Sequence, residues 1–166
     1  PIQLANVAAA MANRGYWYTP HVVRQIGAKS VDPEIFHFKH MTTIDAAHYD
    51  IIIQGMADVF ENGTARTSRL EGLPMAGKTG TAENPHGQDH SIFMAFAPVD
   101  NPKIALAIIV ENGYWGSRWA APIASLMMEK YIHGEISRPN LEKTMVEGSL
   151  TGEYRVQSVK TELPPY

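Results

Sequence analysis

Residues 74–83 read Pro74-Met75-Ala76-Gly77-Lys78-Thr79-Gly80-Thr81-Ala82-Glu83 and place a lysine, a glycine and two threonines in four consecutive positions. Small and apolar neighbours predict an extended strand, with Lys78 and Gly80 on one face and Thr79 and Thr81 on the other. At a sheet edge, the backbone groups of this strand would be free to pair with an extended peptide. Lys78 would supply positive charge, the threonines hydroxyl donors, and Gly80 room for close approach. The stretch therefore indicates a strand edge suited to a peptide that ends in a carboxylate.

The Lys-Thr-Gly run is a weak signal when it is taken alone. Three residues match by chance in many proteins, so the alternative interpretation is a solvated strand end that binds nothing. The segments on either side of the run are needed to choose between these two interpretations.

The segment directly after the strand, residues 84–90, is polar and is broken by proline and glycine, which predicts a turn. It contains His86, Asp89 and His90, whose side chains are of the kinds that bind metal ions. No fourth ligand is in view, so a solvated hairpin loop is the preferred interpretation and no metal ion is expected.

Two more strands are predicted over residues 91–98 and 103–112. The second is continuously apolar along its centre, so we expect it to be buried on both faces. Short turns rich in Pro, Asn, Asp and Gly join the three strands, and such turns are typical of an antiparallel meander.

Helices are predicted on both sides of these strands, over residues 2–14, 43–62 and 119–132. Each is followed by a glycine, which commonly ends helices: Gly15, Gly63 and Gly134. The faces that repeat at helical spacing are Leu4, Val7, Ala8 and Met11; Tyr49, Ile52, Ile53, Met56, Ala57 and Phe60; and Ile123, Leu126, Met127, Lys130 and Tyr131.

The region between the first two helices has a weaker pattern. Residues 21–26 predict a short strand, and residues 34–39 indicate one more after a loop that contains Pro33. Thr43 is the expected N-terminal cap of the second helix.

Bulk composition bounds the class of protein. The chain has 166 residues, of which 45% are hydrophobic and 19% charged, values typical of one globular domain. A net charge of −3 gives no basic field, so nucleic acid is not an expected partner. The absence of cysteine excludes disulfides and thiolate metal sites. No apolar run approaches the roughly 18 residues that a membrane helix needs.

The chain divides in two by composition. Residues 1–134 carry all the periodic segments, whereas residues 135–166 hold prolines and scattered charges with no sustained period. We expect residues 135–166 to form an irregular or disordered C-terminal tail. The chain starts at Pro1 without an initiator methionine and enters a helical pattern at once, so we expect it to be a piece of a longer protein.

Together these elements predict an α+β unit in which helices pack on an antiparallel sheet. With Lys78-Thr79-Gly80-Thr81 on its first strand, the unit resembles the C-terminal part of a penicillin-binding transpeptidase domain, of the serine beta-lactamase/transpeptidase-like fold. Lys-Thr-Gly is one of the three signatures of that family. Further stretches resemble the elongation-type, penicillin-binding protein 2 branch: Pro1-Ile2-Gln3-Leu4-Ala5-Asn6, Asn13-Arg14-Gly15, Thr19-Pro20-His21, the run from Lys78 to Glu83, Met94-Ala95-Phe96-Ala97-Pro98 and Val110-Glu111-Asn112-Gly113.

This resemblance implies peptidoglycan D,D-transpeptidation. A serine attacks the penultimate D-Ala-D-Ala carbonyl of a stem peptide, D-Ala leaves, and an amine of a neighbouring peptide takes the acyl group. Beta-lactams mimic the substrate and trap the acyl-enzyme. The resemblance implies no cofactor. It also implies a parent protein on the extracytoplasmic, periplasmic face of the bacterial inner membrane, with an N-terminal anchor and membrane-bound partners in wall synthesis.

The resemblance assigns roles to four residues. Lys78 would anchor the terminal carboxylate of the substrate, with hydroxyl donors from Thr79 and Thr81, while Gly80 lets the peptide lie along the strand edge. The Thr81 backbone N–H would form half of the oxyanion hole, a contribution of about 3 to 4 kcal/mol. Alternation puts Lys78 and Thr79 on opposite faces, so both can serve one ligand only at an edge or a twist of the strand.

The chain departs from the family in lacking two signatures. No serine is followed by Lys three residues on or by Asn two residues on, which holds for Ser30, Ser68, Ser91, Ser117, Ser125, Ser137, Ser149 and Ser158. In the family these motifs precede the Lys-Thr-Gly strand. We therefore expect the nucleophile to lie before Pro1 and this chain alone to be inactive. Its unpaired sheet edge and exposed apolar surface would favour a homo-oligomer.

Three alternatives remain open from the sequence. In the first alternative, the parent protein would be a D,D-carboxypeptidase or a beta-lactamase with the same chemistry. In the second, it would be a penicillin-sensing module that forms a stable adduct. The third alternative is a plain α+β interaction domain with a chance Lys-Thr-Gly. Tyr114, Trp115 and Trp119 follow the last strand, and their loop is a candidate contact with substrate or partner.

Overall fold

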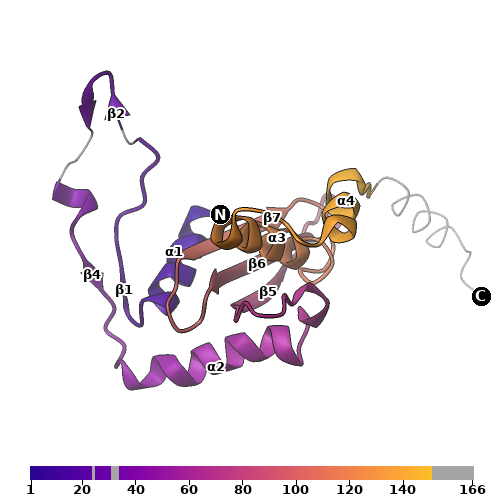
Figure 1. Ribbon diagram of the computed structural model, residues 1–166, viewed down its shortest axis with the longest axis horizontal. Helices are drawn as coiled ribbons and strands as arrows, with labels where there is room; N and C mark the ends of the chain where they lie inside the picture. Colours follow the sequence, from indigo (N-terminus) through magenta and orange to yellow (C-terminus); the bar gives the residue numbers. More distant parts are fainter. Residues whose placement is uncertain (24, 31–33, 151–166) are drawn as a thin grey trace, which may run out of the picture.

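The computed structural model describes residues 1–23, 25–30 and 34–150. Its centre is a three-stranded antiparallel sheet of β5 (Ala76–Ala82), β6 (His90–Ala97) and β7 (Ile104–Val110), in the order β5-β6-β7 (Figure 1). Thr79 pairs with Phe93, and Phe93 with Ile108. The predicted meander and the α+β fold class are confirmed. Within the described residues, β5 and β7 are the two edges of this sheet.

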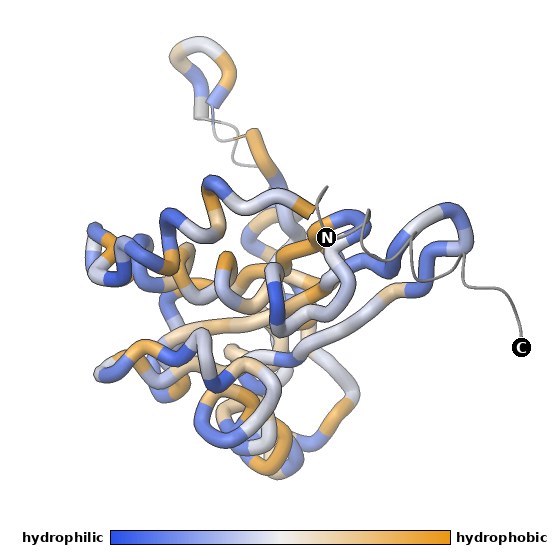
Figure 2. Tube along the Cα trace, turned by 90° about the vertical axis from the view of Figure 1, so that its right-hand side faces the viewer, coloured by the Kyte–Doolittle hydropathy of each residue, from blue (hydrophilic) through white to orange (hydrophobic). Residues whose placement is uncertain are grey.

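Helices cover both faces of the sheet. Helix α1 (Ile2–Ala12) packs on β6 and β7 from one side, and α3 (Ala120–His133) packs on the same strands from the other. Helix α2 (Ala47–Glu61) packs along β5. Hydrophilic residues are common in the outer loops, and hydrophobic residues recur along the helices and the inner strands (Figure 2). None of the described helices is both long and apolar enough to cross a membrane.

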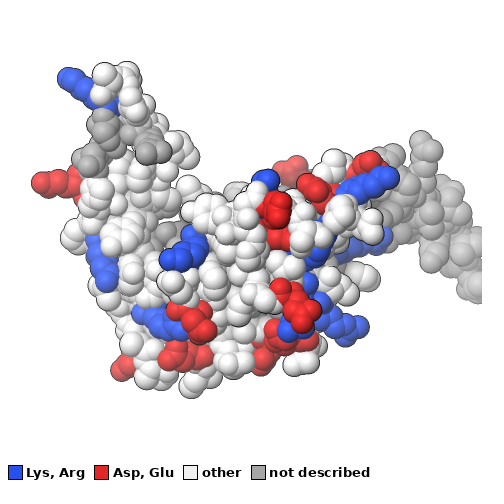
Figure 3. All heavy atoms as spheres, in the orientation of Figure 1, with Lys and Arg blue, Asp and Glu red and all other residues white. Residues whose placement is uncertain are grey.

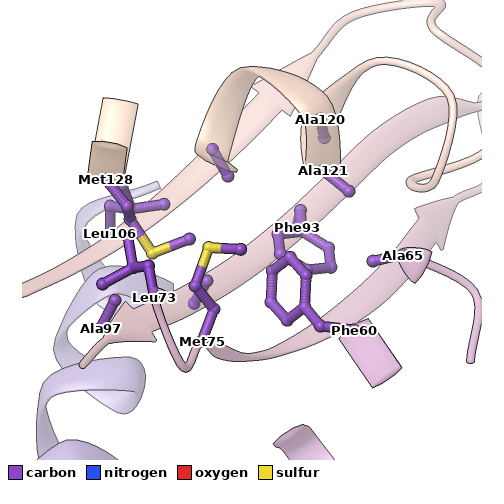
Figure 4. Close-up of a cluster of buried hydrophobic side chains, with 12 residues drawn as sticks. Phe60, Ala65, Leu73, Met75, Phe93, Ala97, Leu106, Ala120, Ala121 and Met128 are labelled. Atoms are coloured by element: carbon purple, nitrogen blue, oxygen red, sulfur yellow. The ribbon is translucent and has the colours of Figure 1, made fainter. Parts of the chain in front are cut away.

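One hydrophobic cluster lies between the sheet and α3. The rings of Phe60 from α2 and Phe93 from β6 meet edge to face with centroids 5.5 Å apart, and Met75 lies beside them (Figure 4). Helix α3 faces this cluster with small residues, including Ala120 and Ala121, so its backbone can approach the strands closely. Side chains along β6 point alternately to the two faces of the sheet, and Phe93 points to the face that α3 covers.

The other face of the sheet holds a second cluster, in which α1 and α2 meet Ala76 and Phe96. Tyr49, Ile53 and Met56 supply the side chains of α2, as the helical spacing predicts. Because Phe60 of the same helix reaches the first cluster, α2 contributes to both hydrophobic clusters.

Several details of the predicted helices are wrong. Thr43 does not cap α2: the helix begins at Ala47 with Ala46 at the N-cap position, which has no capping side chain, and Asp45 Oδ1 accepts the backbone N–H of Ala47 at 2.9 Å just before it. Val7 and Ile52 were predicted to be buried but are exposed. Helix α1 packs on the sheet through its alanines, and the buried stripe of α2 is narrower than predicted, with Tyr49, Ile53, Met56 and Phe60 only.

The predicted inward face of α3 is confirmed at Leu126, which is buried, and wrong at its exposed positions. The helix turns Ala124, Ser125 and Met128 to the sheet, whereas Met127 and Tyr131 are exposed. Gly134 does end the helix, with φ of 82°. Strand β7 is not buried on both faces as predicted, since Leu106 is its only buried residue. The physical reason is that β7 lies at an edge of the described sheet.

The region between α1 and α2 forms a projecting arm (Figure 1). Strand β1 (Tyr16–Trp17) pairs with β4 (His40–Met41), and β2 (Gln25–Ile26) pairs with β3 (Lys29–Ser30). The strand predicted over 21–26 is therefore confirmed only at its end; residue 24 lies outside the described residues. A 3-10 helix η1 (Glu34–Phe36) begins where residues 34–39 suggested a strand, which was wrong.

Residues 139–147 correct the prediction for the C-terminal tail. They form helix α4 (Pro139–Glu147), which packs on α3 and starts with proline at a first-turn position, where no backbone N–H is needed. Just before it, Arg138 pairs with the buried Glu129 of α3 at 2.9 Å. The prediction of an irregular tail is therefore wrong for residues 139–147. The sequence did not indicate this helix, because a single ion pair leaves no periodic signal. Residues 151–166 lie outside the described residues.

Candidate functional site

The Lys-Thr-Gly run lies on β5, at an edge of the described sheet. Lys78 and Thr81 are exposed, and Thr79 and Gly80 are half-buried. Although alternation separates them, Lys78 and Thr79 line the same groove of about 380 Å³, which α2 and the loop after it complete. The other residues of this edge groove are Gly55, Asp58, Val59, Asn62, Gly63 and Thr64. One ligand in the edge groove can therefore contact both side chains.

The ammonium group of Lys78 folds back along the strand. Its Nζ donates a hydrogen bond to the backbone carbonyl of Thr79 at 2.9 Å. In the part of the chain that the structure describes, Lys78 forms no ion pair with a carboxylate. Its ammonium is thus not held in an ion pair and can attract an anionic group, although the Asp58 carboxylate lines the same groove.

The glycines on either side of Lys78-Thr79, Gly77 and Gly80, differ in whether the packing of the strand requires glycine. A Cβ at Gly77 would lie 2.6 Å from Cζ of Phe93, so the packing of that ring requires glycine. A Cβ at Gly80 would meet only Ile92, at an ordinary 3.4 Å. Packing alone therefore tolerates alanine at Gly80, and the absence of a side chain there leaves the strand edge open to a ligand.

Replacing Gly77 with alanine is expected to lower the free energy of unfolding by about 1 to 3 kcal/mol, because the new methyl group overpacks against Phe93. The matched Gly80→Ala variant is expected to change it by less than about 1 kcal/mol. Urea unfolding of the two variants and the unchanged chain measures both effects. Equal destabilisation by the two variants would contradict this account.

The loop after β7 lies against the run. A Cβ at Gly116 would come 2.8 Å from the carbonyl oxygen of Gly80, so the two backbones touch. Buried Ser91, the register partner of Thr81, donates to the Trp115 carbonyl at 2.9 Å and accepts from the Ala120 N–H at 3.2 Å. The loop predicted as a ligand contact is therefore held beside Gly80, with the Trp115 side chain 68% exposed.

The polar residues after β5 make hairpin contacts. Asp89 Oδ1 accepts the Asn84 N–H at 3.3 Å, and His90 Nδ1 accepts the Asn112 N–H at 3.0 Å. Among the described residues, no three His, Asp or Glu side chains gather in a way that could hold a metal ion. On the face drawn in Figure 3, acidic and basic side chains are interspersed.

Sequence reasoning missed Thr64 and Asn62 as residues of the edge groove. They belong to the loop after α2, whose sequence has no period, and only the packing of that helix along β5 brings them to Thr79. An Asn-Gly pair that ends a helix is a weak signal for this geometry. The run itself was placed correctly on an exposed strand.

Comparison with known proteins is consistent across three kinds of evidence. The family model described as "Penicillin binding protein transpeptidase domain" matches residues 1–129. "Peptidoglycan D,D-transpeptidase MrdA" of Haemophilus influenzae is 31% identical over 163 residues, covering 86% of this chain and 25% of that protein. The Acinetobacter baumannii protein of the same name is 33% identical over 159 residues, covering 80% and 22%.

Solved structures agree with these sequence relatives. PBP2 of Pseudomonas aeruginosa matches with a TM-score of 0.67 and 38% identity, over 82% of this chain and 31% of that chain. Penicillin-binding protein A of M. tuberculosis, solved as an imipenem acyl-enzyme complex, matches with a TM-score of 0.68 and 27% identity, over 80% and 30%. The chain spans about a quarter of the length of the first two curated relatives.

Proposed function

The chain belongs to the penicillin-binding protein transpeptidase family, and from that premise we propose that it supplies the substrate-binding edge of a peptidoglycan D,D-transpeptidase. The observation that carries the proposal is the position of Lys78 and Thr79, which line one groove at an edge of the sheet. A cation and a hydroxyl in one groove beside open strand backbone suit an extended peptide with a terminal carboxylate.

In this proposal, the D-Ala-D-Ala end of a stem peptide adds to the edge of β5. The Lys78 ammonium and the hydroxyls of Thr79 and Thr81 bind the terminal carboxylate, while Gly80 leaves the backbone accessible. A serine outside these 166 residues attacks the penultimate carbonyl. The Thr81 backbone N–H then donates to the developing oxyanion, which stabilises the transition state more than the ground state. D-Ala leaves, and an amine of a second stem peptide takes the acyl group.

Beta-lactams are proposed to bind the same edge through their carboxylate. The support is the beta-lactam acyl-enzyme complexes of a structural relative, penicillin-binding protein A of M. tuberculosis. We further propose that the parent protein acts on the extracytoplasmic face of the membrane through an N-terminal anchor, next to membrane-bound wall-synthesis partners. The free edge of β7 would favour self-association of the chain when it is isolated.

Labelling with a fluorescent penicillin tests the proposal, on this chain and on a parent protein that adds the Ser-x-x-Lys and Ser-x-Asn elements. We expect only the parent to be labelled. Product analysis with a stem peptide then separates the activities: a cross-linked dimer supports transpeptidation, released D-Ala alone indicates a carboxypeptidase, and hydrolysed drug indicates a beta-lactamase. A stable adduct without any peptide product indicates a penicillin sensor. A parent that is never labelled would exclude the proposed function.

A further inference from the structure

The hydroxyl of Thr79 has a neighbour that no sequence pattern indicated. Thr64 Oγ1 lies 3.1 Å from Thr79 Oγ1, although the two residues are 15 positions apart. Thr64 follows α2, and both threonines line the edge groove beside Lys78. The site strand and the loop before it therefore meet at a pair of hydroxyl groups.

The structure holds Thr64 in place through both of its neighbours. Gly63 approaches the end of α2 so closely that a Cβ there would lie 2.7 Å from Val59 Cα. Ala65 is fully buried, and its N–H donates to the Val59 carbonyl at 2.9 Å. Because both neighbours are fixed against α2, the backbone directs the Thr64 hydroxyl to Thr79 even though Thr64 itself is exposed.

We propose that Thr64 is a positioning residue for ligand carboxylates, acting through Thr79. The Thr64 hydroxyl donates to Thr79 Oγ1, and the single hydroxyl hydrogen of Thr79 is then free to donate to the carboxylate. In the opposite arrangement Thr79 would donate to Thr64 and present only lone pairs to the anion. The inference rests on the proposed function, since it takes Thr79 as a donor to the carboxylate.

The charge in the groove selects between the two arrangements. An anionic ligand beside Lys78 favours hydroxyl groups that point their hydrogens toward it, and the two hydroxyls in series polarise each other. Thr64 would therefore strengthen the hydrogen bond from Thr79 to a carboxylate, and would contribute little to a ligand that lacks the negative charge. A positioning role for Thr64 therefore predicts a larger effect on a carboxylate ligand than on an uncharged one, whereas a merely structural contact would affect both ligands equally.

The test compares benzylpenicillin with its methyl ester, which lacks the carboxylate charge, on the parent protein and its Thr64→Val variant. For the acid, we expect the dissociation constant of the non-covalent complex to rise about two- to fivefold, because Thr79 can still donate to the carboxylate but loses the donor that orients and polarises its hydroxyl. The rate constant of the acylation step and the reaction with the ester are expected to be unchanged. Thr64→Ser, which keeps the hydroxyl, is expected to restore binding.

Thr67→Val is the matched control, since Thr67 is an exposed threonine of the same connection that does not line the groove. An equal loss for acid and ester, or a loss confined to the acylation step, would overturn the positioning role. Unchanged binding of the acid by Thr64→Val would overturn it as well, while leaving the proposed function standing. A wild-type parent that neither ligand acylates would overturn both.

Discussion

Replacing Lys78 with alanine is expected to slow acylation of the proposed parent transpeptidase by penicillin by about 100- to 1,000-fold, the loss typical of one preorganised electrostatic group. The ammonium lies in the edge groove with Thr79, and it is in no ion pair with a described carboxylate. Removing it takes away the cation opposite the ligand carboxylate. Because Lys78 is exposed, the fold is expected to survive the change.

The measurement is the second-order rate constant for labelling with a fluorescent penicillin. Lys103→Ala is the matched control, since this lysine is also exposed but precedes β7 at the opposite edge of the sheet. Lys78→Arg keeps the charge on a bulkier group, and an intermediate rate is expected. Labelling of Lys78→Ala at the wild-type rate would remove Lys78 from the site.

The second large effect is expected at Arg138, which does not line the edge groove. Replacing Arg138 with alanine is expected to lower the free energy of unfolding by about 3 kcal/mol, because it leaves the buried Glu129 carboxylate without its partner. The side chain of Glu129 is only 1% exposed. Arg138 also donates to the Ser68 carbonyl at 3.0 Å and to Ser125 Oγ at 2.8 Å, so one substitution removes contacts both with α3 and with the segment around Ser68.

The pH dependence of stability checks this account. Burial alone would raise the pKa of Glu129, but hydrogen bonds from Ser137 and Arg138, with the charge of Arg138, outweigh burial and lower it from 4.5. The ionised carboxylate therefore contributes its full stability above pH 4.5, and this contribution is lost as pH falls through the lowered pKa.

Urea unfolding of the chain between pH 7 and pH 3 measures both quantities. In Arg138→Ala, the decline of stability below pH 4.5 is expected to be smaller, since the hydrogen bond and the charge of Arg138 no longer lower the pKa of Glu129 while the two hydrogen bonds from Ser137 remain. The control is Lys143→Ala, which removes an exposed pair with Glu147 and is expected to cost less than about 0.5 kcal/mol. If the two variants lose equal stability, the buried pair does not have the role described here.

The sheet and the position of the run could be predicted from the sequence, because short turns between apolar segments and the alternation around Lys78 are local signals. Most of the inward face of α3 could not be predicted from the sequence. Its alanines pack closely against the sheet, while the larger Met127 and Tyr131 are exposed. Thr64 and Arg138 were missed for a related reason. Their partners, Thr79 and Glu129, are chosen by tertiary packing, which leaves no period in the chain.

Helix α2 joins the two hydrophobic clusters and forms one wall of the edge groove. Its buried side chains, such as Ile53 and Phe60, are committed to the clusters, whereas Asp58 and Asn62 are exposed in the groove. Mutations can therefore alter the groove at these exposed positions without loosening the core. Ligand preference and fold stability are therefore separable traits in this part of the molecule, and substitutions at the exposed positions are expected to change the first with little cost to the second.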